Sequence, residues 1–166
     1  MTRAYIGLGS NLANPRQQLS KALYALTQLP KTTVVATSAL YQSAPVGPQN
    51  QPDYLNATVA LDTALEPLAL LDALQAIETQ QGRVRKEHWG ARTLDLDILL
   101  FGSHIINTPR LTIPHPYLSQ RSFVLMPLAD ISPDLQLPDG QLLVDLVKLC
   151  PPEGLTRLST LIIEDV

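Results

Sequence analysis

Hydrophobic and polar positions alternate along the segment from Trp89 to Phe101, around which the rest of the chain is organised. A period of two predicts a β-strand whose apolar face carries Leu94, Leu96, Ile98 and Leu100. Asp95 and Asp97 then point to the other face, with Cα atoms about 6–7 Å apart at the usual rise of a strand. Two carboxylates at this separation can bind one or two hard divalent cations through their oxygen atoms.

The same patterns predict the other elements. Apolar residues at helical spacing predict helices that start at Asn14–Pro15 and at Pro67, and shorter ones at 121–129 and 142–149. Alternating or β-branched stretches predict strands at 4–8, 32–41, 54–63, 104–107 and 158–163. Gly7-Leu8-Gly9-Ser10-Asn11 lacks the third glycine of a dinucleotide-binding fingerprint, so a tight turn into the first helix is the favoured interpretation.

The order of these elements is strand, helix, strand, strand, helix, strand, followed by further elements. This order predicts an α+β protein with a ferredoxin-like βαββαβ core and extra C-terminal elements. Its antiparallel sheet would be flanked by helices, as an α/β/α sandwich. The chain has 166 residues, and we find no repeat or linker, so one domain is expected over residues 1–166.

Composition excludes several classes of protein. The net charge is −3 and there is no long basic run, which argues against a nucleic-acid protein held by counterion release. The one cysteine, Cys150, excludes an internal disulfide framework and a cysteine-based zinc site. The chain reaches Gly7 too soon for a secretory signal, and no apolar run has membrane-spanning length. We therefore expect a cytoplasmic protein that does not bind membranes.

Cationic residues precede the two acids and strengthen the metal hypothesis. An Asp-x-Asp pair on a strand is by itself usually part of a solvated face. Here Arg83, Arg85 and Arg92 lie just upstream, across an aromatic-Gly-x-Arg turn that begins at Trp89. A metal-bound polyphosphate needs both kinds of group, because the ion neutralises part of its charge and guanidinium groups neutralise the rest.

Other candidate positions allow two interpretations each. Tyr54 and Asn56 share a strand face and could stack on and hydrogen-bond a flat heterocycle, but an ordinary strand edge would look the same. Gln75 and Glu78 share a helix face, for which surface polarity is the simpler interpretation. His115 is held between two prolines, yet a lone histidine is more often structural. The Pro-rich loop 43–53 and the polar connection 83–91 are long enough to be functional lids or simple connections.

Several of these segments together resemble the 6-hydroxymethyl-7,8-dihydropterin pyrophosphokinase family, over roughly Ala4 to Gly140. The motifs that carry the resemblance are Gly9-Ser10-Asn11, Gln51-Pro52-Asp53-Tyr54-Leu55-Asn56, Gln81-Gly82-Arg83-Val84-Arg85, Trp89-Gly90-x-Arg92-x-Leu94-Asp95-Leu96-Asp97-Ile98, Pro114-His115 and Arg121-x-Phe123. The resemblance implies transfer of pyrophosphate from ATP, the co-substrate, to the hydroxymethyl oxygen of the pterin, with release of AMP. It also implies small-molecule substrates and a monomer.

The resemblance further implies a role for each matching residue. Asp95 and Asp97 would hold two Mg²⁺ ions, and Arg83, Arg85 and Arg92 would take phosphate charge. The positions expected near the nucleotide are Gln75, Glu78, Trp89, Ile98, Arg110, Thr112, His115 and Arg121. Those expected around the pterin are Ser43, Ala44, Pro45, Val46, Gly47, Tyr54, Asn56, Trp89 and Phe123.

The sequence departs from the family pattern in three places. Ser43-Ala44-Pro45-Val46 replaces a more common Thr-Pro-Pro-Leu-like stretch, the basic loop at Lys86-Glu87-His88 is short, and Pro116-Tyr117 stands where some relatives have Tyr directly after His. The tail after Leu149 has no usable motif. Two other classes stay open: a nucleotide sensor that holds Mg-ATP without transfer, and a two-metal phosphodiesterase. The combination of Tyr54, Asn56 and Phe123 argues against both.

Overall fold

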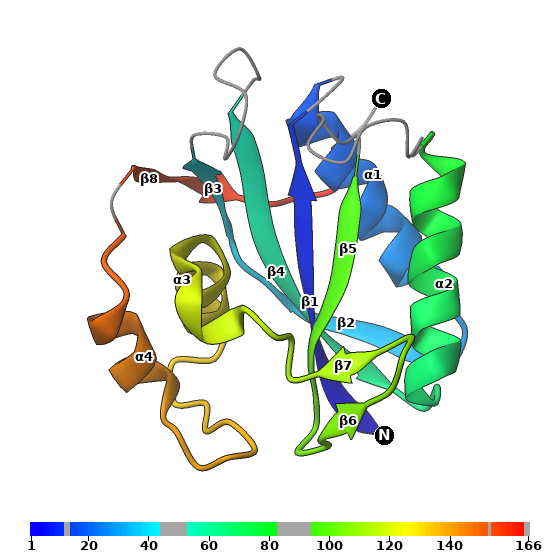
Figure 1. Ribbon diagram of the computed structural model, residues 1–166. Helices are drawn as coiled ribbons and strands as arrows, with labels where there is room; N and C mark the ends of the chain where they lie inside the picture. Colours follow the sequence, from blue (N-terminus) through cyan, green and yellow to red (C-terminus); the bar gives the residue numbers. More distant parts are fainter. Residues whose placement is uncertain (12–13, 44–52, 83–93, 153, 165–166) are drawn as a thin grey trace.

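The structure is a computed structural model that describes residues 1–11, 14–43, 53–82, 94–152 and 154–164. A six-stranded antiparallel sheet forms its centre, with helices on both faces (Figure 1). The elements are β1 (Thr2–Ser10), α1 (Pro15–Thr27), β2 (Thr32–Thr37), β3 (Ala39–Ser43), β4 (Tyr54–Thr63), α2 (Pro67–Gln80), β5 (Asp95–Phe101), β6 (Ile106–Asn107), β7 (Thr112–Ile113), a 3₁₀ turn (Leu118–Gln120), α3 (Ser122–Ile131), α4 (Leu143–Leu149) and β8 (Leu155–Thr160).

Strand β4 lies at the middle of the sheet. The strand order is β5-β1-β4-β3-β8, and β2 also pairs with β4. One edge of β4 therefore pairs with β1, while its other edge pairs with β2 toward Thr63 and with β3 toward Tyr54. This arrangement confirms the predicted ferredoxin-like α+β core.

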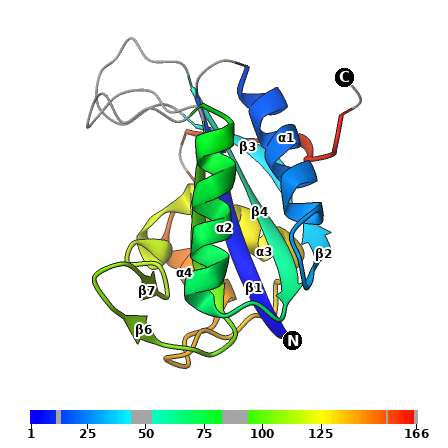
Figure 2. The same ribbon diagram turned by 90° about the vertical axis from the view of Figure 1, so that its right-hand side faces the viewer.

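Each face of the sheet has its own hydrophobic cluster. Helices α1 and α2 cover one face, and α3 and α4 lie on the other (Figure 2). The α1/α2 cluster includes Ile6, Leu8, Val59, Leu61 and Ile98, as the strand alternation predicts. No helix in the described ranges has both the length and the apolar character that a membrane span requires.

The predicted strand 32–41 is two strands, which meet at Ser38. The N–H of Ser38 donates to the carbonyl of Thr58 at 2.9 Å, and the N–H of Thr58 donates to Oγ of Ser38 at 2.9 Å. A side-chain hydroxyl thus replaces a backbone partner at this point. The chain can change direction here without leaving a buried N–H group unpaired.

The predicted turn at Gly7–Asn11 is wrong, because β1 continues through Ser10. Gly9 pairs with Asn56 on one side and with Asp95 on the other, and Gly7 pairs with Thr58 and Asp97. Backbone partners on both sides keep this glycine-rich stretch extended.

The alternation predicted for β5 holds through Ile98 but fails at Leu100. Ile6 pairs with Ile98 and Tyr5 pairs with Leu100, so Leu99 is an extra residue in the ladder. After this β-bulge, each following residue points to the face of the sheet opposite to the one that strict alternation predicts. Leu100 consequently packs in the α3/α4 cluster, and Phe101 packs in the α1/α2 cluster.

The C-terminal strand lies earlier than predicted, at Leu155–Thr160 instead of 158–163. It pairs with β3 and extends the sheet beyond the ferredoxin-like core. The residues after β8 form hydrogen bonds with other parts of the chain. The N–H of Leu161 donates to the carbonyl of Ser38, and the N–H of Glu164 donates to Oγ of Ser20 on α1.

Candidate active site

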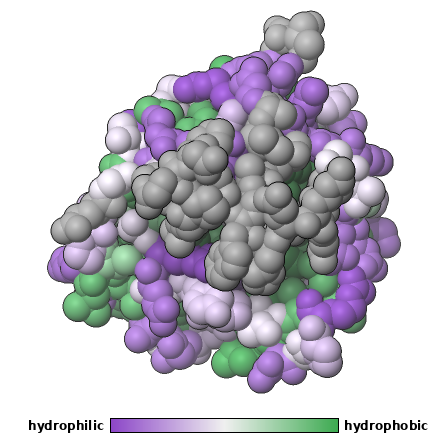
Figure 3. Space-filling view, turned by 45° about the horizontal axis from the view of Figure 1, so that its top comes forward, coloured by the Kyte–Doolittle hydropathy of each residue, from purple (hydrophilic) through white to green (hydrophobic). Residues whose placement is uncertain are grey.

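Four strand ends meet at one end of the sheet, which is the upper end in Figure 1. Here β1 and β3 finish, at Ser10 and Ser43, and β4 and β5 begin, at Tyr54 and Asp95. Figure 3 shows the surface from this side, where the described hydrophobic residues occur in separate small groups among hydrophilic ones. Antiparallel pairing therefore brings positions from distant parts of the sequence to one place.

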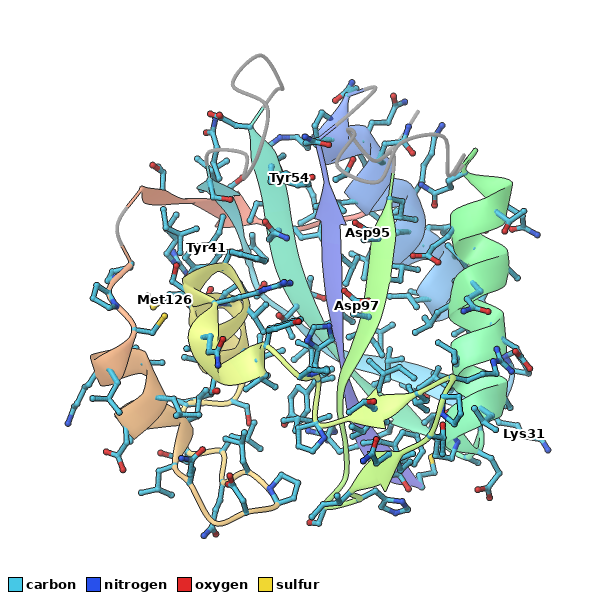
Figure 4. All side chains as sticks on the ribbon, in the orientation of Figure 1. Lys31, Tyr41, Tyr54, Asp95, Asp97 and Met126 are labelled. Atoms are coloured by element: carbon cyan, nitrogen blue, oxygen red, sulfur yellow. The ribbon has the colours of Figure 1, made fainter. Side chains whose placement is uncertain are left out.

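The two acids occupy the same face of β5, the face that α3 partly covers. Asp95 is half-buried and Asp97 is exposed, and Figure 4 shows them one after the other along the strand. The residues directly opposite on β1 are Gly9 and Gly7. Because glycine has no side chain, β1 puts nothing between these carboxylates and the residues of β4.

Glu78 anchors the strand that carries the two acids. Its carboxylate is 5% exposed and accepts the N–H of Leu96 at 2.9 Å. Leu96 lies between Asp95 and Asp97, so α2 holds the peptide that joins them. The interpretation of Glu78 as a surface residue is wrong. It stands eight residues after Leu70 and four after Leu74, which is the spacing of the buried helix stripe.

A surface contact connects the β6/β7 hairpin to α2. The Nη2 atom of Arg110 donates to Oδ1 of Asp72 at 2.7 Å and to Oε1 of Gln75 at 3.3 Å. Thr112 is exposed on β7. The structure thus brings together two of the predicted nucleotide positions, Gln75 and Arg110.

His115 packs against the outer edge of β5 and is half-buried. The backbone N–H of His115 donates to the carbonyl of Leu99 at 3.0 Å, and the ring atom Nδ1 accepts the backbone N–H of Tyr117 at 3.3 Å. Burial lowers the pKa of His115 below its ordinary value, Asp97 opposes the shift, and the positive charge of Arg121 adds to it. The lowered pKa favours the neutral form of the imidazole, and because Nδ1 accepts a hydrogen bond, Nε2 is the nitrogen that would carry the proton.

Arg121 lies beside two aromatic rings just before α3. Its guanidinium carbon is 4.7 Å from the ring centroid of Tyr117 and 5.6 Å from that of Phe123. Such cation–π contacts hold a flexible arginine in one region. Tyr117 was not predicted as a site residue, although the tyrosine that some relatives have directly after the histidine was a signal for it.

The remaining predicted residues divide into two groups. Ile98 is 3% exposed in the α1/α2 cluster, Ser43 pairs with Tyr54 at the end of β3, and Tyr54, Asn56 and Phe123 are half-buried. The positions that lie outside the described residues are Ala44, Pro45, Val46, Gly47, Arg83, Arg85, Trp89 and Arg92.

The site combines two acids, a histidine, and an arginine that lies against two aromatic rings. Such a combination suits an anionic ligand with bound metal. A family model described as 7,8-dihydro-6-hydroxymethylpterin-pyrophosphokinase (HPPK) matches residues 5–133. The chain belongs to this family.

Two bacterial relatives carry the name 2-amino-4-hydroxy-6-hydroxymethyldihydropteridine pyrophosphokinase. The protein from Pseudomonas aeruginosa is 58% identical over 156 residues, which are 94% of this chain and 96% of the relative. The protein from Haemophilus influenzae is 56% identical over 159 residues, which are 96% and 99% of the two chains. The chain therefore matches these relatives over nearly their whole length.

Solved structures share the fold at much lower identity. A crystal structure described as HPPK-DHPS in complex with substrates has a TM-score of 0.74 at 16% identity, over 95% of this chain and 46% of that one. A Plasmodium falciparum HPPK-DHPS structure with pteroate has a TM-score of 0.71 at 16% identity, over 89% and 42%. The chain spans less than half the length of these proteins, so the likeness concerns the fold alone.

Proposed function

We propose that the chain transfers pyrophosphate from ATP to 6-hydroxymethyl-7,8-dihydropterin, giving AMP and the pterin diphosphate in folate biosynthesis. Family membership and the names of the bacterial relatives support this activity. The observation that carries it is the placement of Asp95 and Asp97 on one face of β5, close to His115. We also propose that the enzyme acts as a single-domain monomer in the cytoplasm.

The two carboxylates fit Mg²⁺, which prefers oxygen ligands and retains several waters. Within the described ranges, no three His, Cys, Asp or Glu side chains are grouped to hold a metal. We propose that Asp95 and Asp97 hold two Mg²⁺ ions, and phosphate oxygens and water would complete the coordination. The ions would neutralise phosphate charge during transfer.

The chain's own residues would bind and align the two substrates. Tyr54 and Phe123 would stack on the pterin, and the amide of Asn56 would hydrogen-bond its polar edge. Arg121 and His115 would contact the triphosphate. The nucleoside would lie toward Gln75, Glu78, Ile98, Arg110 and Thr112. The same proposal assigns Ser43, Ala44, Pro45, Val46 and Gly47 to the pterin, Trp89 to both substrates, and Arg83, Arg85 and Arg92 to the phosphates.

This arrangement suits phosphoryl chemistry. The hydroxymethyl oxygen attacks the β phosphorus in line and loses its proton to solvent, the bond from that phosphorus to the α-phosphate oxygen breaks, and AMP leaves. Alignment and charge neutralisation supply most of the catalysis in such transfers, so a protein nucleophile is not required.

The direct test measures AMP from ATP with and without the pterin. We expect pterin-dependent AMP in the wild type and a loss of at least about 100-fold in Asp95→Ala and Asp97→Ala, as for removal of other charge-stabilising groups. Asp62→Asn is the matched control, because Asp62 is an acid of β4 that pairs with Arg3 far along the same sheet.

Three outcomes would contradict the proposal. Near-normal rates in either alanine variant would remove the acids from the mechanism. ATP hydrolysis without the pterin would favour a phosphodiesterase. Binding of Mg-ATP with no turnover in the presence of the pterin would favour a nucleotide sensor.

A further inference from the structure

The side chain of Asn56 lies across a neighbouring strand at a position that only glycine leaves open. Gly9 on β1 pairs with Asn56 on β4. A Cβ atom built on Gly9 would be 2.8 Å from Nδ2 of Asn56, whereas real Cβ atoms essentially never approach closer than 3.0 Å. The amide therefore occupies the space that a side chain at position 9 would need.

The position of the Asn56 amide above Gly9 places it within the candidate active site. Strand β1 lies between β4 and β5, and Gly9 pairs with Asp95 on its other side. An amide of Asn56 that lies above Gly9 is thus displaced from β4 toward the strand of the two acids. Tyr54 precedes Asn56 by two residues and shares its face of β4.

We infer that Gly9 is a positioning residue that acts through Asn56. By having no side chain, it lets the Asn56 amide lie over β1, where its donor and acceptor can reach a flat heterocycle stacked beside Tyr54. The identity of that heterocycle as a pterin rests on the proposed function. The dependence of the amide position on Gly9 follows from the geometry of the described residues.

Gly7 provides a matched control within the same strand. Gly7 lies on the same face of β1 as Gly9 and likewise pairs with an acid of β5, Asp97. The three atoms nearest to a Cβ at Gly7 all belong to Leu99, with Cδ2 at 3.2 Å, and Leu99 is not among the proposed substrate contacts. Neither glycine has a positive φ, so the backbone accepts alanine at both positions.

The kinetic test compares Gly9→Ala with Gly7→Ala. In Gly9→Ala we expect the KM for the pterin to rise about 10-fold, as expected for loss of one or two neutral hydrogen bonds, with little change in affinity for an ATP analogue. In Gly7→Ala both quantities should stay within about 3-fold of wild type, because the side chain that must shift is that of Leu99, which contacts neither substrate in the proposal. An unchanged pterin KM in Gly9→Ala would overturn the inference.

A double-mutant cycle separates positioning from direct collision with the substrate. If Gly9 acts through Asn56, Gly9→Ala should add almost nothing in an Asn56→Ala background. If the new methyl group collides with the substrate itself, the double variant should be worse than Asn56→Ala by the full factor. The second result would overturn the role assigned to Asn56.

An NMR measurement tests the geometry without any activity. The side-chain amide signal of Asn56, identified by its loss in Asn56→Ala, should shift in Gly9→Ala and stay in place in Gly7→Ala. Equal behaviour of the two variants would contradict the inference. If the wild type forms no pterin-dependent AMP, the proposed function fails, and this signal still decides the inference.

Failure of Gly9→Ala to fold would also be informative. Folding should then be restored in the double variant with Asn56→Ala, because the clashing amide is gone. A double variant that remains unfolded would overturn the inference.

Discussion

The carboxylate of Glu78 has a structural role that its polar character conceals. It accepts the N–H of Leu96, the residue between Asp95 and Asp97, in a buried environment. An apolar replacement would leave that buried N–H without this acceptor, at a cost of about 1–3 kcal/mol. The position of the two acids therefore depends on a side chain from the neighbouring helix.

We predict that Glu78→Leu lowers the free energy of unfolding by about 1–3 kcal/mol. Glu78→Gln should lose less, because its amide oxygen can still accept from Leu96. Urea unfolding with an unchanged m-value measures both. Glu66→Gln is the control, since Glu66 is exposed at the start of α2 and its side chain makes no capping bond. Equal losses in the Leu and Gln variants would show that the hydrogen bond contributes little.

At the scale of elements, a polar contact fastens α3 to β3. Asp130 near the end of α3 accepts the hydroxyl of Tyr41 at 2.8 Å and the N–H of Ala39 at 3.2 Å. Arg157 of β8 lies 3.6 Å from the same carboxylate. Helix α3 begins next to Phe123, and β3 ends at Ser43, so this contact fixes the two elements that carry the proposed pterin positions relative to each other.

The contact predicts a specific pH dependence. Burial, and then the hydrogen bond to Asp130, raise the pKa of Tyr41 to about 12. The unfolded chain releases this proton near pH 10 and the folded chain does not, so the free energy of unfolding should fall as pH rises from about 10 to about 12.

Tyr41→Phe removes this contribution. The stability difference between wild type and Tyr41→Phe should be constant below about pH 10 and should shrink above it. Chemical unfolding at several pH values measures the difference. Tyr24→Phe is the control, because Tyr24 is 54% exposed. Parallel stability curves for wild type and Tyr41→Phe would contradict the assignment.

Local pattern predicted the elements well where one residue type dominates a face. The strand expected at 54–63 is β4 to the residue, because Ala57, Val59 and Leu61 recur at every second position and form one apolar face. The bulge at Leu99 could not be predicted, since it depends on the register with β1. Gly7 and Gly9 were misinterpreted for the same reason: their local preference is for turns, and only their partners on β4 and β5 explain an extended conformation.

The sequence predicted the kind of site better than it predicted which residues surround it. Asp95 and Asp97 were selected as candidates by their spacing and by the nearby arginines. Tyr117 and Gly9 were not, because one acts by stacking beside Arg121 and the other by leaving space for Asn56. The contact between Gly9 and Asn56 joins residues far apart in the sequence, and the one between Tyr117 and Arg121 spans a short 3₁₀ turn, so neither produces a regular local pattern.

For the whole molecule, the hypothesis that residues 83–91 close over the bound substrates stays a prediction, because they lie outside the described residues. Trp89 is the only tryptophan in the chain, so its emission reports on this segment. We expect a larger change in emission with both the pterin and a non-transferable ATP analogue than with either alone, since a closing segment would contact both. Trp89→Phe gives the background signal. Identical emission in the free and doubly bound protein would contradict closure.

The position of β5 in the sheet has a consequence for behaviour at high protein concentration. The strand that carries Asp95 and Asp97 is the outermost strand on its side. Exposed outer strands offer free backbone groups on which a second molecule can assemble, and this is a common route to aggregation. Here the N–H of Leu96 is bound by Glu78 and the carbonyl of Leu99 by the N–H of His115. The protein can thus keep its two acids at an accessible margin of the sheet while withholding these two groups from intermolecular strand pairing.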